Sequence, residues 1–188
     1  MSDSIVRAGL RERYIAAPDF AEMLESARQN VELWSAVSRR ASVDEAQVQR
    51  VAALGGERHL LVLSEDWCGD AVNTLPVIAR LAGLAPNLDL RILPRDENLD
   101  LMDAHLSGTS RSIPVAIALD ADYVERGWWG PRPADLQQWV LTDGRSLNKD
   151  ARYREIRRWY ARDRGRTTIL EVVALLERAA GIASTTFR

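Results

Sequence analysis

The stretch from Arg58 to Leu84 constrains the fold more than any other part of the chain. It begins with a short apolar run, Leu60 to Leu63, whose length and composition favour a strand buried on both faces. It continues with apolar residues at helical spacings of three and four, namely Val72, Leu75, Ile78, Ala79 and Ala82. A strand that leads directly into a helix indicates an α/β unit. Its junction holds Cys68, the only cysteine among the 188 residues.

The position of Cys68 predicts opposing influences on its pKa. Unpaired backbone N–H groups and the positive end of the helix dipole stabilise a thiolate at a helix start. Nearby carboxylates oppose it by like charge, and the chain has three of them here: Glu65, Asp66 and Asp70. These residues alone leave the sign of the net shift open. They also leave open that Cys68 is a small, buried apolar residue without chemistry.

Three features of this chain resemble the thioredoxin family. Trp67-Cys68-Gly69-Asp70-Ala71 is similar to the Trp-Cys-Gly-Pro-Cys active-site segment of thioredoxins. Pro76 follows Cys68 by eight residues, where that family has its helix-kinking proline. Arg111-Ser112-Ile113-Pro114-Val115 is similar to the segment that carries the family's cis-proline. The resemblance implies a thioredoxin-like, three-layer α/β/α fold with a central mixed sheet, in which Pro114 is cis and lies against Cys68.

The departures from the family pattern limit the chemistry. Ala71 replaces the second cysteine, Asp70 replaces the proline of the motif, and Val62 stands where thioredoxins bury an aspartate. A dithiol reductase releases its mixed disulfide with its own second thiol, and this chain has none. Autonomous disulfide reduction is therefore excluded. Single-thiol chemistry resolved by an external thiol remains, as does sulfenic acid formation.

The candidate site follows from the motif. Cys68 is the expected nucleophile, with an exposed thiol. If it acts in thiol redox chemistry, its pKa should lie below the ordinary value of about 8.5. The substrate groove is expected to comprise Trp67, Gly69, Asp70, Ile113 and Pro114. Asp70 either relays protons to the sulfur or stabilises the helix through its dipole, and the second is favoured. Trp67 is either a surface platform beside the thiol or a packed core aromatic.

The favoured function is that of a thiol redox protein without a cofactor, whose partner is a protein disulfide or a low-molecular-weight thiol. One alternative is a non-catalytic binding or scaffold module that uses the groove at Pro114. Another is an inert site whose thiol forms a dimer on oxidation. His59, His105 and one thiol, far apart in sequence, argue against a Cys/His metal site.

Composition narrows the classes of partner and the cellular compartment that we expect. The net charge of −2 predicts no general attraction to nucleic acid or to a membrane surface, and no apolar run is long enough to span a bilayer. The first four residues, Met1-Ser2-Asp3-Ser4, lack the features of a signal peptide. Together with the single cysteine, this favours a reducing cytoplasm. Residues 145–166 are rich in arginine, which indicates a binding surface for an acidic partner or, as we favour, a solvated helix face.

The pattern predicts one compact domain in three parts: a helical N-terminal extension at 1–57, a thioredoxin-like core at 58–140 and a helical C-terminal extension at 141–188. A capping box at Asp19 and Glu22 opens a helix that runs to about Arg40. Further capping boxes are expected at residues 42–45 and 168–171. Trp128 and Trp129 point to opposite faces of a strand, so one of them either lines the groove near Cys68 or, as we favour, covers the helical extension.

Overall fold

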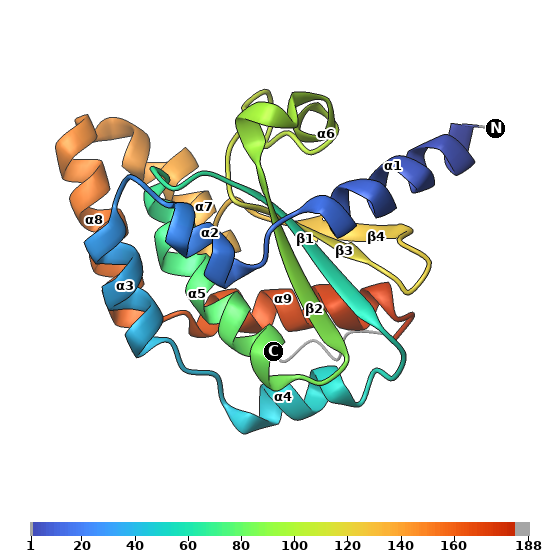
Figure 1. Cartoon of the computed structure of the whole chain (residues 1–188). Helices are drawn as coiled ribbons and strands as arrows, with labels where there is room; N and C mark the ends of the chain where they lie inside the picture. The colour runs from blue at the N-terminus through green and yellow to red at the C-terminus, as the bar shows by residue number, and fades with distance from the viewer. Residues whose placement is uncertain (1, 183–188) are drawn as a thin grey trace.

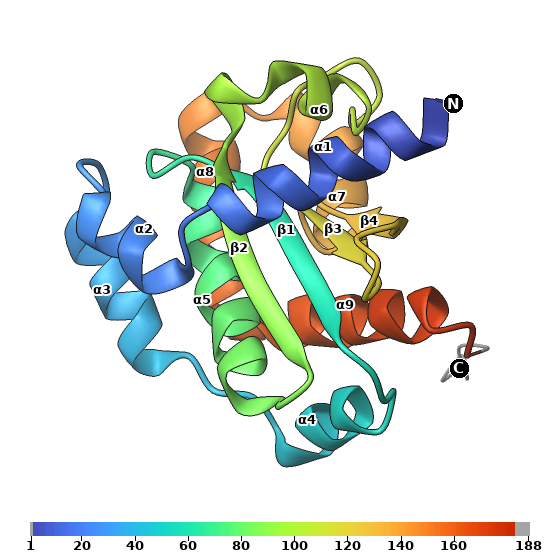
Figure 2. The same cartoon turned by 45° about the vertical axis from the view of Figure 1, so that its right-hand side comes forward.

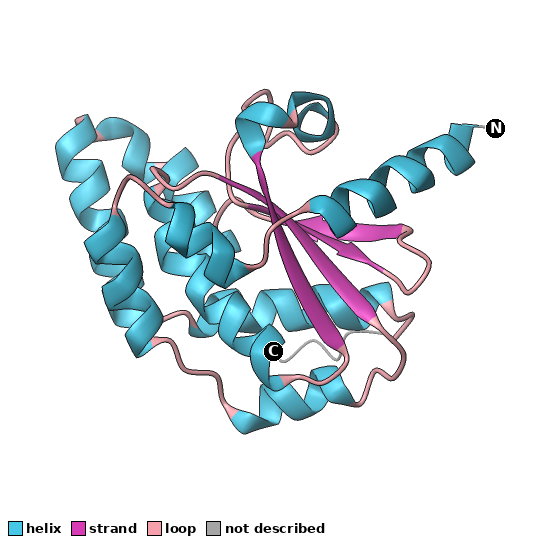
Figure 3. Cartoon of the chain, in the orientation of Figure 1, coloured by secondary structure: helices cyan, strands magenta, loops and turns pink. Residues whose placement is uncertain are grey.

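The computed structural model describes residues 2–182, with the backbone alone for residues 2–8. Its sheet contains β1 (Arg58–Ser64), β2 (Leu88–Pro94), β3 (Val115–Leu119) and β4 (Glu125–Trp129), in the order β2-β1-β3-β4 (Figure 1). β1 pairs in parallel with β2 and antiparallel with β3, which pairs antiparallel with β4. The predicted mixed sheet is confirmed, and Figure 3 shows its strands enclosed by helices.

β1 is the central strand because its side chains suit burial on both faces. All of its residues except Arg58 are buried, and Val62 pairs with Ile92 on one side and with Ala116 on the other. The helix that follows, α5 (Gly69–Leu84), carries Pro76 in its interior and buries its apolar stripe. Because β1 leads directly into α5, Cys68 is fixed at the carboxyl end of the central strand.

Helices cover both faces of the sheet, which confirms the three-layer α/β/α architecture. α5 and α9 (Arg166–Ala179) pack against each other, and α9 also packs on β3 and β4. α1 (Ser2–Ala16) crosses in front of the strands in Figure 2, while α9 lies behind them. The hydroxyl of Tyr14 on α1 donates a hydrogen bond to Asp89 on β2 at 2.7 Å, and its ring packs on His59 of β1. These contacts hold α1 on the sheet.

The predicted continuous helix from residue 20 to residue 40 is wrong. The chain forms α2 (Phe20–Ser26) and α3 (Val31–Arg40), and the Asp19–Glu22 capping box opens α2 as expected. Between the helices, the backbone N–H groups of Arg28 and Gln29 donate to the carboxylate of Asp66 at 2.7 and 2.9 Å. Asp66, which is distant in sequence, thus replaces two helical hydrogen bonds. The apolar pattern of residues 20–40 gives no sign of this interruption.

The capping boxes predicted at residues 42–45 and 168–171 are wrong, unlike the one at Asp19 and Glu22. α4 (Glu45–Ala52) begins after Asp44, without a side-chain cap. α9 begins at Arg166, so Thr168 lies buried inside the helix, and the carboxylate of Asp163 accepts the N–H of Thr167 instead. Gly165, with φ +81°, starts α9 in a left-handed conformation that glycine adopts without strain.

The remaining helices lie around the ends of the sheet. They are η1 (Arg95–Glu97), α6 (Leu99–Asp103), α7 (Ala134–Leu141), η2 (Asp143–Ser146) and α8 (Lys149–Asp163). α7 and α8 share a small apolar cluster of Leu136, Ile156 and Tyr160, separate from the main core. Trp129 donates its indole N–H to Glu171 on α9 at 2.6 Å, so it covers that helix, as favoured. Within residues 2–182, no helix is long and apolar enough to cross a membrane.

Candidate functional site

Cys68 and the loop that contains Pro114 lie together, although 45 positions separate Cys68 from Ile113. Cys68 is the residue immediately before α5, and its Sγ donates a hydrogen bond to the carbonyl oxygen of Ile113 at 3.3 Å. The peptide bond between Ile113 and Pro114 is cis, as the resemblance implies. The nucleophile expected from the sequence is therefore in direct contact with the expected groove loop.

The expectation of an exposed thiol is wrong, because Cys68 is only 7% exposed. Burial raises the pKa of the Cys68 thiol to about 11, and the charge of Asp70 acts in the same direction. The backbone N–H groups of Asp70 and Ala71 lower this pKa, as does Arg132, but burial and the charge of Asp70 outweigh them. The thiol is therefore protonated at neutral pH. The direction of the pKa shift, which the sequence left open, is opposite to the one that a redox nucleophile requires.

Asp70 forms a buried ion pair that neither sequence interpretation anticipated. Its side chain accepts Nη2 of Arg132 at 2.6 Å on one oxygen and the hydroxyl of Tyr160 at 2.9 Å on the other. Burial raises the pKa of Asp70, while Arg132 and Tyr160 favour its charged form. Burial also raises the pKa of Tyr160, and Asp70 adds to this, so its hydroxyl remains a donor. Asp70 is thus a buried, fully partnered group beside the thiol rather than a surface acid.

The loop after β4 delivers Arg132 to this site. A Cβ on Gly130, which has φ +135°, would collide with the carbonyl of Pro114, so only glycine lets the two loops approach this closely. The Gly130–Pro131 peptide is also cis. Gln137 on α7 accepts the other terminal nitrogen of Arg132 at 2.9 Å. The guanidinium is therefore held from two sides.

The sequence analysis missed Arg132 and Tyr160. Tyr160 lies 90 positions from Asp70. It belongs to the stretch interpreted as a solvated helix face with its aromatic side chains turned to the core, and no local pattern connects it with Asp70. The one available signal is the unusual run Trp128-Trp129-Gly130-Pro131-Arg132-Pro133, which marks a specialised loop without naming a partner.

The predicted groove residues divide into exposed and buried groups. Trp67 is 42% exposed, and the guanidinium of Arg95 lies 5.2 Å from the centre of its ring, so Trp67 is a surface platform rather than a core residue. Gly69 is also exposed, whereas Ile113 and Pro114 are buried. The groove expected at Pro114 is therefore covered in this conformation.

The other candidate residues have structural contacts. Glu65 accepts the backbone N–H of Asp96 at 2.8 Å, and Asp66 holds the turn between α2 and α3. His105 is buried against Glu125, and His59 stacks on Tyr123. Among residues 2–182, no group of three or more His, Cys, Asp or Glu side chains is arranged to hold a metal ion.

Comparison with known families assigns the class. The sequence model described as thioredoxin matches residues 17–157, which is most of the chain and more than the segment that carries the motifs. Together with the order of the strands and the contact between Cys68 and the cis-proline loop, this match shows that the chain belongs to the thioredoxin family.

Two solved structures share the fold. One is a protein of unknown function from Pseudomonas aeruginosa, which is 23% identical, with a TM-score of 0.70 over 89% of this chain and 96% of the other. The other is an HIV epitope-scaffold, which is 20% identical, with a TM-score of 0.71 over 92% of this chain and 98% of the other. A search of curated protein sequences gave no match.

Proposed function

We propose that this protein carries out single-cysteine thiol chemistry, in which Cys68 exchanges with the disulfide of a protein or of a low-molecular-weight thiol. The observation that carries the proposal is the position of Sγ, 3.3 Å from the carbonyl oxygen of Ile113 and beside the cis-proline loop. Once the loop opens, a thiol in this place meets a chain that pairs with the loop backbone. Exposed Trp67 and Gly69 supply the adjoining surface.

The exchange needs two thiols, of which the protein supplies one. The Cys68 thiol loses its proton to solvent, and the thiolate attacks one sulfur of the disulfide. A new S–S bond forms as the old one breaks, and the departing sulfur leaves as a thiolate that takes up a proton. An external thiol then attacks the mixed disulfide, which restores Cys68 and carries the fragment away in a new disulfide. Ala71 offers no sulfur for this second step.

The resting state makes this reaction slow. With a pKa of about 11, few Cys68 side chains are thiolates at neutral pH. The burial of the thiol also means that a large disulfide must open the loop before the sulfurs meet. We therefore expect the rate to rise steeply with pH and to be higher for small disulfides than for folded proteins.

Glutathione disulfide provides the direct test. At about pH 9, intact-mass measurement should show one glutathione adduct per chain, absent from Cys68→Ser, and reduced glutathione should remove it completely. The matched control is an unstructured peptide that contains Cys68, which reports the rate of an accessible thiol. Absence of any adduct on the folded protein, under conditions that fully convert the peptide, would reject the proposal.

A second candidate function is a binding or scaffold module that uses the same face without thiol chemistry. The burial of Cys68 and its raised pKa favour it. Under this alternative, proteins retained by the immobilised wild type under reducing conditions are retained equally by Cys68→Ser. Under the first candidate, retention without reductant depends on Cys68 and ends when reductant is added.

The proposal includes the cellular compartment and the kind of partner. A chain with one cysteine suits a reducing compartment such as the cytoplasm, where no structural disulfide is needed. The net charge of −2 supports neither a nucleic acid nor a membrane surface as the general partner. The proposed chemistry requires no cofactor or metal.

A further inference from the structure

A cleft elsewhere on the molecule is lined by Tyr160 but not by Cys68 or Asp70. The cleft, of about 670 Å³, is bounded by α3, α5, α8 and the start of the turn to α9. This volume is in the range of small-molecule sites, about 300–1,000 Å³. Figure 1 shows α3 and α8 beside the first half of α5. Tyr160 belongs to both sites, because it lines the cleft while its hydroxyl donates to Asp70.

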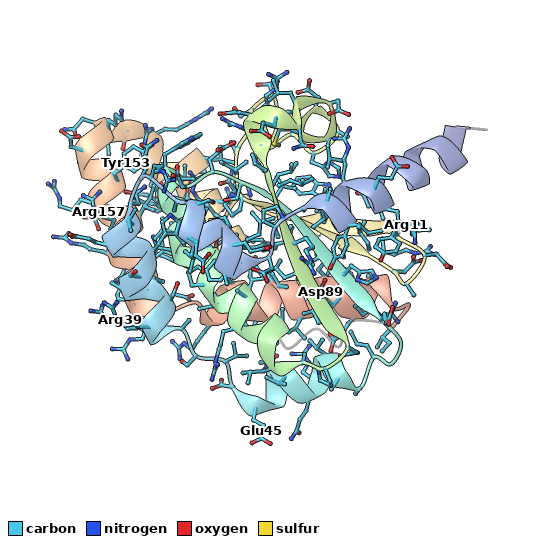
Figure 4. All side chains as sticks on the ribbon, in the orientation of Figure 1. Arg11, Arg39, Glu45, Asp89, Tyr153 and Arg157 are labelled. Carbon is cyan, nitrogen blue, oxygen red and sulfur yellow. The ribbon has the colours of Figure 1, made fainter. Side chains whose placement is uncertain are left out.

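The lining of the cleft combines aliphatic side chains with arginines at its rim, and it also contains Ser42 and Asn73. Leu33, Val37 and Val77 supply aliphatic walls from α3 and α5. Arg40, Arg157 and Arg164 lie around the opening, one from the end of α3 and two from α8 and its C-cap. All three arginines are exposed, and Figure 4 shows Arg157 extending outward from α8. No carboxylate lines the cleft.

The charge of the rim is not neutralised within the described part of the chain. The ion pairs found among residues 9–182 include none formed by Arg40, Arg157 or Arg164. By contrast, Arg158, next to Arg157 in the same helix, pairs with Glu155 at 2.6 Å. Three cations around an apolar cavity attract an anion that also carries an apolar body.

We infer that the cleft binds a small anionic amphiphile, a molecule with an acidic head such as a carboxylate or phosphate and an apolar body. The head lies at Arg40, Arg157 and Arg164, and the body lies against Leu33, Val37 and Val77. Planar guanidinium groups match carboxylate and phosphate oxygens in two-pronged hydrogen bonds, which a bare apolar groove cannot provide. This inference goes beyond the proposed thiol chemistry, because the ligand needs no contact with Cys68.

Titration calorimetry with decanoate and decyl phosphate tests the inference on the full-length protein. We expect saturable binding of one molecule per chain, with decanol and decyltrimethylammonium binding much more weakly. Replacing both Arg157 and Arg164 by Gln should weaken binding by about fivefold, since an exposed charge contact contributes modestly. Ala161→Trp, which fills the cleft from an exposed position on its lining, should abolish binding.

Matched variants separate the cleft from other effects. Arg154→Gln removes an exposed arginine of the same helix that does not line the cleft, and its affinity should equal that of the wild type. Cys68→Ser should also bind normally, so failure of the thiol chemistry leaves this result unchanged. Thermal unfolding curves confirm that each variant is folded.

Three outcomes would overturn the inference. The first is an absence of saturable binding of either anion. The second is equal binding of decanol, or unchanged affinity in the Arg157/Arg164 double variant, because the rim would then have no role. The third is arginine-dependent binding to vesicles of phosphatidylglycerol and phosphatidylcholine without any binding of free decanoate or decyl phosphate, which would assign the rim to a membrane surface.

Discussion

At the scale of single residues, Cys68 lies between influences of opposite sign. The backbone N–H groups at the start of α5 and the charge of Arg132 lower its pKa, whereas burial and the charge of Asp70 raise it. Asp70 and Arg132 also hold each other, because their side chains pair at 2.6 Å. Burial has the largest effect on the Cys68 pKa, and the ion pair adds two charges of opposite influence beside the thiol.

Asp70→Asn should make Cys68 more reactive. The substitution removes the anion that raises the Cys68 pKa and leaves Arg132, which lowers it, without its carboxylate. We expect about a tenfold faster alkylation by iodoacetamide at pH 8, which corresponds to a fall of about one unit in the Cys68 pKa. The pH–rate profile measures the shift directly.

Tyr160→Phe is the matched control for that experiment and a prediction about stability. It removes a donor to the Asp70 carboxylate but keeps the negative charge beside Cys68. Because a buried acceptor loses one partner, the free energy of unfolding should fall by about 1–3 kcal/mol in urea titrations. Its alkylation profile should stay close to that of the wild type. Equal acceleration in both variants would mean that loosened packing, not charge, controls the thiol.

At the scale of elements, contacts distant in sequence decide where helices end. Asp66 separates α2 from α3 by accepting two backbone N–H groups, and Gly165 separates α8 from α9. The helix that follows each of these turns, α3 or α9, packs against α5. A Cβ on Gly165 would lie 2.6 Å from Cγ1 of Val77 on α5, so the α8–α9 turn is seated directly on that helix.

Gly165→Ala should be strongly destabilising. The new methyl group would clash with Val77 and would force a left-handed backbone on alanine, and together these cost about 2–4 kcal/mol. Gly83→Ala is the matched control, because Gly83 is exposed inside α5 with open space at its Cβ position. That change should leave stability unchanged or raise it by up to about 1 kcal/mol. Similar unfolding midpoints for the two variants would contradict the close packing of the α8–α9 turn on Val77.

The contact between the loop after α6 and β4 should depend on pH. Burial lowers the pKa of His105, but its hydrogen bonds to Glu125 and to the carbonyl of Leu101 outweigh this effect, so its pKa is raised in the folded state. The resulting stabilisation is complete below about pH 6.5, the unfolded value, and is lost as pH rises through the folded pKa.

Glu125→Gln measures that dependence. The loss of unfolding free energy relative to the wild type should be larger at about pH 6, where His105 is charged, than at about pH 9, where it is neutral. Urea titrations at both values provide the comparison. A loss that is constant or grows with pH would show that His105 does not pair with Glu125 as a cation.

At the scale of the whole molecule, the fold was predictable because local patterns and global topology agree. The apolar run of β1, the helical stripe of α5 and the strand pattern of β3 predict the elements, and the three motifs at Cys68, Pro76 and Pro114 predict their arrangement. The cis conformation at Pro114 and its contact with Cys68 were predictable in the same way. The elements are encoded in adjacent residues, whereas the cis-proline and its contact with Cys68 were implied by the resemblance to the thioredoxin family.

The properties of the site depend on partners that no local pattern contains. The burial of Cys68 and the pairing of Asp70 with Arg132 and Tyr160 follow from how the loop after β4 and helix α8 close over the start of α5. The prediction of an exposed thiol was wrong for this reason. A family motif fixes the position of a side chain along the fold, but it does not determine which other segments bury that side chain. Helix α8 also lines the cleft beside Tyr160, together with α3 and α5.

The measurement that tests the central claim most directly is the rate at which Cys68 forms a mixed disulfide with glutathione disulfide, across a range of disulfide concentrations. If Cys68 is a nucleophile at a functional thioredoxin-fold site, the rate rises in proportion to the disulfide concentration under native conditions, and reduced glutathione reverses the product. A rate that does not depend on disulfide concentration, and that follows the rate of unfolding in urea, would mean that the thiol reacts only in the unfolded chain and would contradict the account.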